Sequence, residues 1–267
     1  MTILLTIFVF ILAMGIHEFG HAWEMKKQGV EIAEIGIGIP IPKLPYLRLS
    51  VRHLWGINIV LTFHPLLLGA YVKPSEVGYQ VAQSLPDRAL HLIYAGGIVA
   101  NLLTWGIITI VFGLLGWMNM TLMIPAVIAT ILCLFLRTVL SVYIIPILGL
   151  VFTGLVVHSL VAMPVTESVA GPAGVVSLIH GQIAGKSSLL PQLKAAVFML
   201  GFISLVLGTM NTLPLYVLDG GRSVLLYLQK WGFSRKALEW YMFGSTGIFV
   251  CLVILAFYSD AVKLIFN

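Results

Sequence analysis

The chain has 267 residues, of which 60% are hydrophobic and only 9% are charged, whereas about 25% of residues are charged in ordinary soluble proteins. So few charged groups could not cover a soluble surface of this size, which excludes a soluble protein and predicts a single membrane-embedded domain over residues 1–267. The formal net charge of +5 does not indicate a nucleic-acid partner, because the basic residues lie between apolar segments and form no stripe.

Apolar segments long enough to cross the hydrocarbon core, which takes about 20 helical residues, recur along the chain. We therefore predict an all-α polytopic membrane protein with about six transmembrane helices. These spans are expected at about Thr2–Trp23, Leu90–Leu115, Leu122–Leu136, Thr138–Leu160, Leu193–Leu213 and Trp240–Phe257. Because only Arg137 separates the third span from the fourth, the pair is also compatible with one bent element and a short re-entrant piece.

The loop between the first and second spans, Glu24–Ala89, carries the pattern of a small β-sheet. Apolar and polar residues alternate with the period of a strand in Leu47–Arg52, and again in Ile57–Phe63 after a turn. A similar alternation occurs earlier, in Ile35–Ile39. We expect these strands to lie against the cytoplasmic face, where an exposed edge either pairs with an unwound substrate or only plugs the mouth of the protein.

The distribution of lysine and arginine predicts the orientation in the membrane. In the six-span arrangement, twelve of the 15 lie on the side that holds the long loop and the segment Pro214–Glu239. Positively charged residues favour the cytoplasmic side of a membrane. We therefore expect the long loop in the cytoplasm and both termini outside.

The first span contains the motif His17-Glu18-Phe19-Gly20-His21. Residues four apart share one face of a helix, so both imidazoles can bind a single Zn²⁺. Glu18 lies beside them, where it can act as general base toward a water at the metal. A helix end with interfacial polar residues is the alternative, but such residues inside an apolar span are costly and usually mark function.

Two histidines leave one protein ligand of a catalytic zinc unassigned. Asp219 comes just after the fifth span, and the predicted topology puts it at the same depth as His17 and His21. Pro214 would break the helix there and let the chain turn back. The alternatives are an ordinary interfacial turn at Asp219 and a ligand role for Glu24, which follows on the first span and is more simply an interfacial charge.

Two motifs together resemble the site-2 protease family of intramembrane zinc metalloproteases. One is His17–His21 in the first span, and the other is Asn211-x-x-Pro214-x-x-x-Leu218-Asp219-Gly220 in a late one. Three further segments are similar to family elements, with Ala70 and Gly97 in place of a usual Gly and Pro. They are Gly69–Val72, Ala95–Asn101 and Gly171–Gly174.

The resemblance implies one catalytic Zn²⁺ with His17, His21 and Asp219 as ligands and Glu18 as base. It also implies that Asn211 lies near the scissile carbonyl, where a carboxamide N–H can stabilise an oxyanion. Helix packing is the alternative role for Asn211. The implied partners are the lipid bilayer and a transmembrane substrate, cut within or beside the membrane as in regulated intramembrane proteolysis.

Several alternatives stay open. A zinc-binding scaffold or inactive pseudoprotease would need no base at Glu18, and a metal transporter would need polar residues along several spans. Asn101 either orients a ligand or ties helices together, and Glu167 and Glu239 are conceivable ligands. We expect neither a PDZ-like domain nor a C-terminal nucleotide-sensing domain, because the corresponding segments are apolar or short.

Overall fold

The computed structural model describes residues 2–41, 44–54, 57–118, 121, 123–135, 140–162, 172–184, 186 and 188–266. In this part of the chain, five helices are long and apolar enough to cross a membrane. They are formed by α1 (Thr2–Lys27), α3 (Asp87–Leu114), the π-helix η2 (Leu140–Ile144) continued by α6 (Ile145–Ala162), α9 (Leu189–Met210) and α11 (Arg235–Phe266). The protein is therefore a mostly helical, multi-pass membrane protein.

The described part of the predicted third span forms the helix α4 (Met123–Phe135), whose 13 residues cover about 20 Å at 1.5 Å per residue. A second short apolar helix, α8 (Pro172–Ala184), was not predicted. Apolar composition alone does not distinguish a short helix that packs among spans from one that crosses. Arg137, which marked the boundary, lies outside the described residues.

The sheet has four strands rather than the three that the alternation predicted. These are β1 (Ile32–Ile39), β2 (Leu47–Leu54), β3 (Ile57–Phe63) and β4 (Leu66–Pro74), in the order β2-β3-β1-β4. The β1–β3 pair is parallel and the other two pairs are antiparallel. The sequence analysis missed β4 because its three consecutive leucines hide the period of two. The short helix α2 (Glu76–Gln83) follows it.

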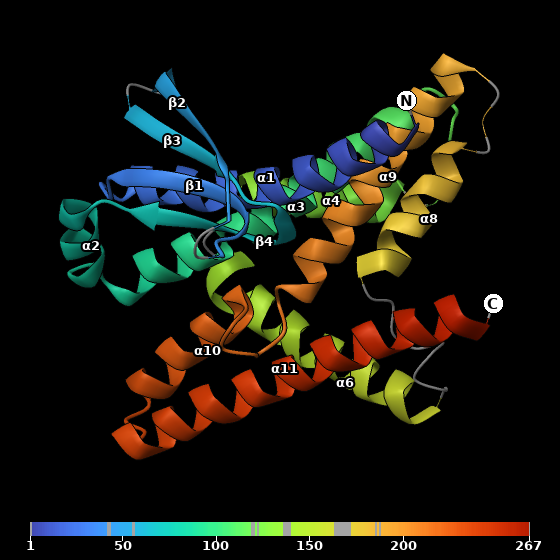
Figure 1. The fold of residues 1–267 in the computed structure, drawn as a ribbon. Coiled ribbons are helices and arrows are strands. Elements are labelled where there is room, and N and C mark those ends of the chain that lie inside the picture. Colours follow the sequence, from blue (N-terminus) through green and yellow to red (C-terminus); the bar gives the residue numbers. More distant parts are fainter. Residues whose placement is uncertain are drawn as a thin grey trace.

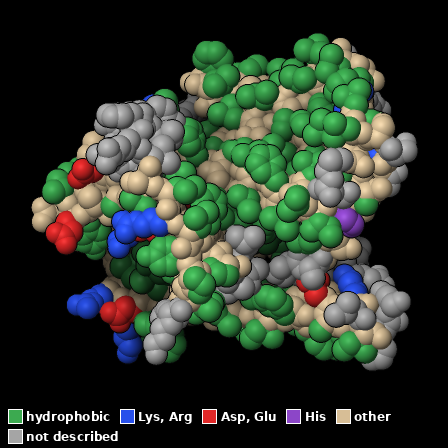
Figure 2. All heavy atoms as spheres, turned by 45° about the horizontal axis from the view of Figure 1, so that its top comes forward, with side chains coloured by type: hydrophobic (Ala, Val, Ile, Leu, Met, Phe, Trp, Pro, Cys, Tyr) green, Lys and Arg blue, Asp and Glu red, His purple; other side chains and the backbone are tan. Residues whose placement is uncertain are grey.

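The sheet and the two chain termini lie at opposite ends of the helices (Figure 1). The sheet, α2 and α10 (Asp219–Lys230) are on the left of this view, and both the N and C marks are on the right. Charged side chains also gather mainly on the left of the space-filling view, whereas hydrophobic side chains cover most of the rest of this face (Figure 2). This separation agrees with a bundle of membrane helices that carries its polar elements at one end.

The helices α1 and α3 touch through their backbones. A Cβ atom on Gly20 of α1 would lie 2.2 Å from the carbonyl oxygen of Gly96 on α3, so neither position leaves room for a side chain. On its other side, α1 packs against α8 and α9 through a buried apolar cluster that includes Ala13, Ile183 and Met199. The C-terminal part of α1 is thus held at a fixed distance from α3.

Candidate metal centre

Three potential metal ligands meet inside the protein, two from α1 and one from the first residue of α10. Nε2 of His17 lies 3.1 Å from Oδ2 of Asp219, and Nε2 of His21 lies 3.2 Å from the same oxygen. The two Nε2 atoms are themselves 3.2 Å apart. All three side chains are buried. The turn of helix between His17 and His21 places both rings on one face, as the spacing of four requires.

Asp219 reaches this point because the chain reverses after α9. The helix ends at Met210, a turn follows, and the backbone N–H of Gly220 donates to the carbonyl oxygen of Asn211 at 2.7 Å. A Cβ atom on Gly220 would lie 2.1 Å from the carbonyl oxygen of Thr212, so the turn closes more tightly than any side chain permits. The turn therefore points the start of α10 back toward α1.

The helix α11 holds the outside of the same turn. The hydroxyl of Tyr241 lies 3.0 Å from the carbonyl oxygen of Pro214 and 2.9 Å from that of Gly221, and can donate to either. The backbone N–H of Tyr216 donates to Oγ of Ser245 at 3.1 Å. These contacts satisfy polar backbone groups of the turn and of the first residues of α10.

Each imidazole also has a partner at its other nitrogen. Nδ1 of His21 donates to the carbonyl oxygen of Ile93 at 2.7 Å, which leaves Nε2 as the ligand atom. Nδ1 of His17 lies 3.0 Å from the amide nitrogen of Asn101, a fully buried residue whose Oδ1 has no hydrogen-bond partner within the described residues. A half-turn of the carboxamide would let Oδ1 accept from Nδ1–H of His17. Asn101 thus contacts the ligand residue His17, as expected if it orients a ligand, which is one of the two roles that the sequence left open.

The electrostatic environment keeps the Asp219 carboxyl ionised. Burial by itself would raise its pKa, but the charge of His21 and the hydrogen bonds from both histidines outweigh burial, so the pKa lies well below its usual range. Binding of a metal would displace the proton from His21, and an ionised carboxylate with two neutral imidazoles is a donor set typical of catalytic zinc.

The spacing of the three ligand atoms fits a metal ion. Bonds of about 2.0–2.1 Å in a tetrahedron put neighbouring ligand atoms about 3.3–3.4 Å apart, close to the distances of 3.1 and 3.2 Å observed here. A Cβ atom on Gly97 would lie 2.5 Å from Nε2 of His21, so the glycine leaves space beside the ligands. The residues present therefore fit a bound zinc.

A cavity of about 200 Å³ opens beside the three ligands. Glu18 and Asn211 both line it, as do Tyr71, Tyr94 and Arg222, which the sequence analysis did not single out as site residues. Arg222 had a usable signal, because it follows Asp219 by three residues and so lies near it on one helix face. Tyr71 lies in the segment Gly69–Val72 that resembles a family element, whereas Tyr94 gave no local signal.

The other acidic residues that were considered as ligands do not join this group. Glu239 is half-exposed and forms an ion pair with Arg235 at 3.1 Å. Glu24 is buried one turn away and is not among the three converging residues. Glu167 lies outside the described residues. The amide nitrogen of Asn211 donates to the carbonyl oxygen of Leu207 at 3.0 Å, so in this structure it caps its own helix.

Residues 5–255 match the profile of peptidase family M50. The chain belongs to this family, the site-2 protease family. No curated protein matches the chain. An M50 protein is a membrane metalloprotease that depends on zinc, and His17, His21 and Asp219 are a group able to bind the metal. The family match covers both the motif on α1 and the turn that carries Asp219.

Proposed function

We propose that this M50 protein is an intramembrane zinc endopeptidase that hydrolyses a peptide bond in or near a transmembrane segment of a membrane-protein substrate. One observation carries the proposal. Three buried ligands converge within apolar helices, and a fourth ionisable group, Glu18, lines the same cavity. A carboxylate next to a metal site but outside the ligand set is what a metalloprotease needs as its base.

The residues around the cavity have separate roles in this proposal. Zinc held by His17, His21 and Asp219 would supply Lewis acidity to the scissile carbonyl and to water. Glu18 takes a proton from the attacking water and delivers it to the leaving amine. Asn211 lines the cavity and would donate to the developing oxyanion once its amide nitrogen leaves the carbonyl of Leu207.

Three neighbours prepare this arrangement. The carbonyl oxygen of Ile93 and the carboxamide of Asn101 orient the two imidazoles. The guanidinium-bearing Arg222 lines the cavity near the position where negative charge develops on the substrate. Apolar helices around the cavity limit the access of bulk water, which strengthens each of these interactions.

The edge of the sheet offers a way to hold an extended substrate. The strand β4 pairs only with β1 among the described strands, and its residues Ala70, Tyr71 and Val72 line the cavity. A substrate segment that adds to β4 as a further strand would present its backbone to the metal. Proline within that segment cannot complete the ladder, so its introduction should slow cleavage. Unchanged cleavage would indicate that the strands do not pair with the substrate and only plug the mouth of the protein.

We also propose that the metal site faces the cytoplasm and that both termini lie outside. This follows from the concentration of Lys and Arg at the end that carries the sheet and α10. Single cysteines at Lys186 and Lys230 should react with an impermeant reagent from opposite sides of the membrane. Labelling of both from one side would exclude this orientation.

The substitution Glu18→Gln tests the catalytic proposal directly. It removes the base but no ligand, so cleavage of a single-pass membrane substrate should fall by about 10²–10⁴-fold while one zinc stays bound. Cleavage and zinc content are measured on the same purified sample, with Glu239→Gln as a matched control far from the cavity. A scaffold or pseudoprotease predicts instead that the wild-type protein and Glu18→Gln are equally inactive.

A further inference from the structure

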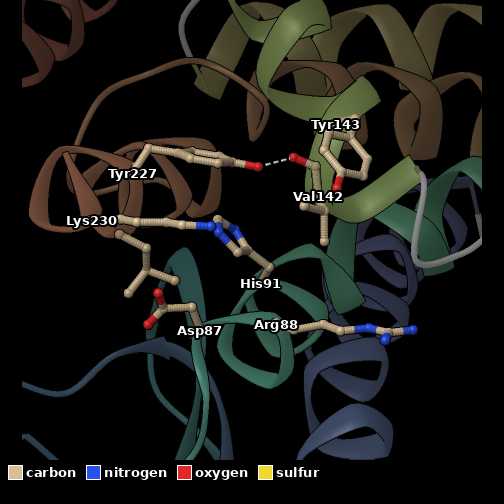
Figure 3. A pocket seen from close by; sticks show the side chains of 8 residues that line it. Asp87, Arg88, His91, Val142, Tyr143, Tyr227 and Lys230 are labelled. Atoms are coloured by element: carbon tan, nitrogen blue, oxygen red, sulfur yellow. Dashed lines mark hydrogen bonds between the residues drawn. The ribbon is translucent and has the colours of Figure 1, made fainter.

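A second cavity, of about 370 Å³, lies apart from the metal centre and shares no lining residue with it. It is bounded by the first turns of α3, by η2 and by the last turns of α10 (Figure 3). The polar residues that line it are Asp87, Arg88, His91, Tyr143, Tyr227 and Lys230. The proposed proteolytic reaction uses none of them.

One of the polar residues that line this cavity is almost fully buried. His91 is only 4% exposed, and its Nδ1 atom is itself buried and makes no hydrogen bond within the described residues. A buried donor without a partner costs free energy, which favours the tautomer that carries the ring proton on Nε2. Figure 3 shows the His91 ring and the end of the Lys230 side chain pointing toward each other.

The charges around the cavity favour an anion. Lys230 brings a positive charge next to His91, and in the Nε2–H tautomer the His91 ring would offer a further donor. The only carboxylate among the lining residues is Asp87, against the two cations Arg88 and Lys230. Figure 3 shows the Arg88 side chain turned away from His91, so it adds charge at the rim rather than a contact. The Tyr227 hydroxyl already donates to the carbonyl oxygen of Val142.

The position of the cavity indicates a lipid. It lies at the first turn of α3, whose 28 residues extend about 42 Å and so exceed a hydrocarbon core of about 30 Å, which would put this turn among the lipid head groups. Two tyrosines line it, Tyr227 and the 62% exposed Tyr143, and the exposed ring of Trp231 lies beside Tyr227, which is typical of a membrane interface. Directly beyond it, α6 presents the exposed apolar residues Ile147 and Leu150. A ligand with an anionic head and apolar chains fits a cationic cavity that lies next to an apolar helix face.

We propose that this cavity binds the phosphate group of a membrane phospholipid, which accepts hydrogen bonds from Lys230 and His91 while the acyl chains lie along α6. The excess of positive charge predicts a preference for an anionic head group. The helix α10 has Asp219 as its first residue and Lys230 as its last. A bound lipid would therefore anchor the far end of the helix that carries the third metal ligand.

The test measures lipid retention by the full chain and needs no proteolysis. The purified protein in detergent is titrated with phosphatidylglycerol, and bound lipid is counted by native mass spectrometry. Lys230→Gln should weaken binding roughly tenfold, because it removes a charged donor, and Lys230→Arg should retain it. Lys236→Gln is the matched control, since Lys236 is exposed on α11 and does not line the cavity.

Two outcomes would overturn the proposal. One is equal retention of phosphatidylglycerol by the wild-type protein and Lys230→Gln. The other is displacement of the lipid by millimolar inorganic phosphate, which would show a site for a free anion. Because neither measurement involves cleavage, failure of the lipid site and failure of the proposed protease activity are separable.

Discussion

The helices α1 and α11 are nearly equal in hydropathy but differ in what they do. The most apolar 18-residue stretch has a mean hydropathy of 2.1 in α1 and 2.0 in α11. Yet 39% of this stretch is buried in α1 and only 11% in α11. Gly20 on α1 touches the backbone of α3, whereas Gly247 on α11 faces open space. Hydropathy thus finds both spans, but small and polar residues distinguish the span that builds the site from the one that faces lipid.

The contribution of α11 to the metal site is confined to its N-terminal half. Tyr241 and Ser245 contact the turn that positions Asp219, and further along the helix Asp260 accepts a hydrogen bond from the backbone N–H of Gly174. Most of the remaining helix is exposed. A substitution on α1, or on an element that α1 contacts, should therefore have a larger effect than a matched substitution on α11.

The largest difference is expected between two carboxylates, Asp219 at the start of α10, which meets the histidines of α1, and Asp260 on α11. Asp219→Ala removes a ligand, so zinc and cleavage should be lost together. Asp260→Asn should keep one zinc, because Asp260 bonds the start of α8 and not the metal group. Zinc content by elemental analysis and cleavage of one substrate check both variants. Zinc retained at wild-type affinity in Asp219→Ala would remove Asp219 from the ligand set.

The next effect concerns the support of α1 by α3. Asn101→Ala removes the partner of His17, and loss of such an orienting group typically weakens metal binding by about 10–100-fold. Thr104→Ala, one turn further along α3, removes only a hydroxyl that donates to the carbonyl of Ala100 and should leave affinity unchanged. Competition with a zinc chelator measures both. Similar affinities in the two variants would reduce Asn101 to a packing residue.

A glycine pair tests the packing itself. A methyl group on Gly20 would meet the Gly96 carbonyl, and overpacking of this kind costs about 1–3 kcal/mol of unfolding free energy. The same change at Gly247 meets nothing within 4 Å and should leave stability unchanged or slightly raise it. Thermal unfolding in one detergent compares the two. Equal melting temperatures would mean that α1 and α3 are not in backbone contact.

The smallest effect should come from the tyrosines of α11. Tyr241→Phe removes one hydroxyl from the turn before Asp219 and should cost about 0.5–1.5 kcal/mol, seen as a few-fold loss of zinc affinity. Tyr258→Phe alters an exposed ring on the same helix and should have no effect. If both variants bind zinc like the wild type, the contact with α11 does not position the ligand.

Local spacing in the sequence was enough to identify one half of the metal site. Because a helix repeats every 3.6 residues, the spacing of His17 and His21 already places both rings on one face. The long apolar segments and the first three strands were likewise predictable, since each depends on a short periodic pattern. The strand β4 and the short helix α8 were not, because their apolar residues suit several environments equally well.

Only the tertiary structure decided how distant residues meet. Asp219 contacts His17 across 202 positions of sequence, and Asn101 contacts His17 across 84. Neither contact can be predicted from a local sequence pattern. Tyr71, Tyr94 and Arg222 line one cavity only because β4, α3 and α10, which carry them, come to lie side by side. The second cavity likewise exists only because α3, η2 and α10 converge. Spacing along the chain determines a helix face, whereas packing determines what that face meets.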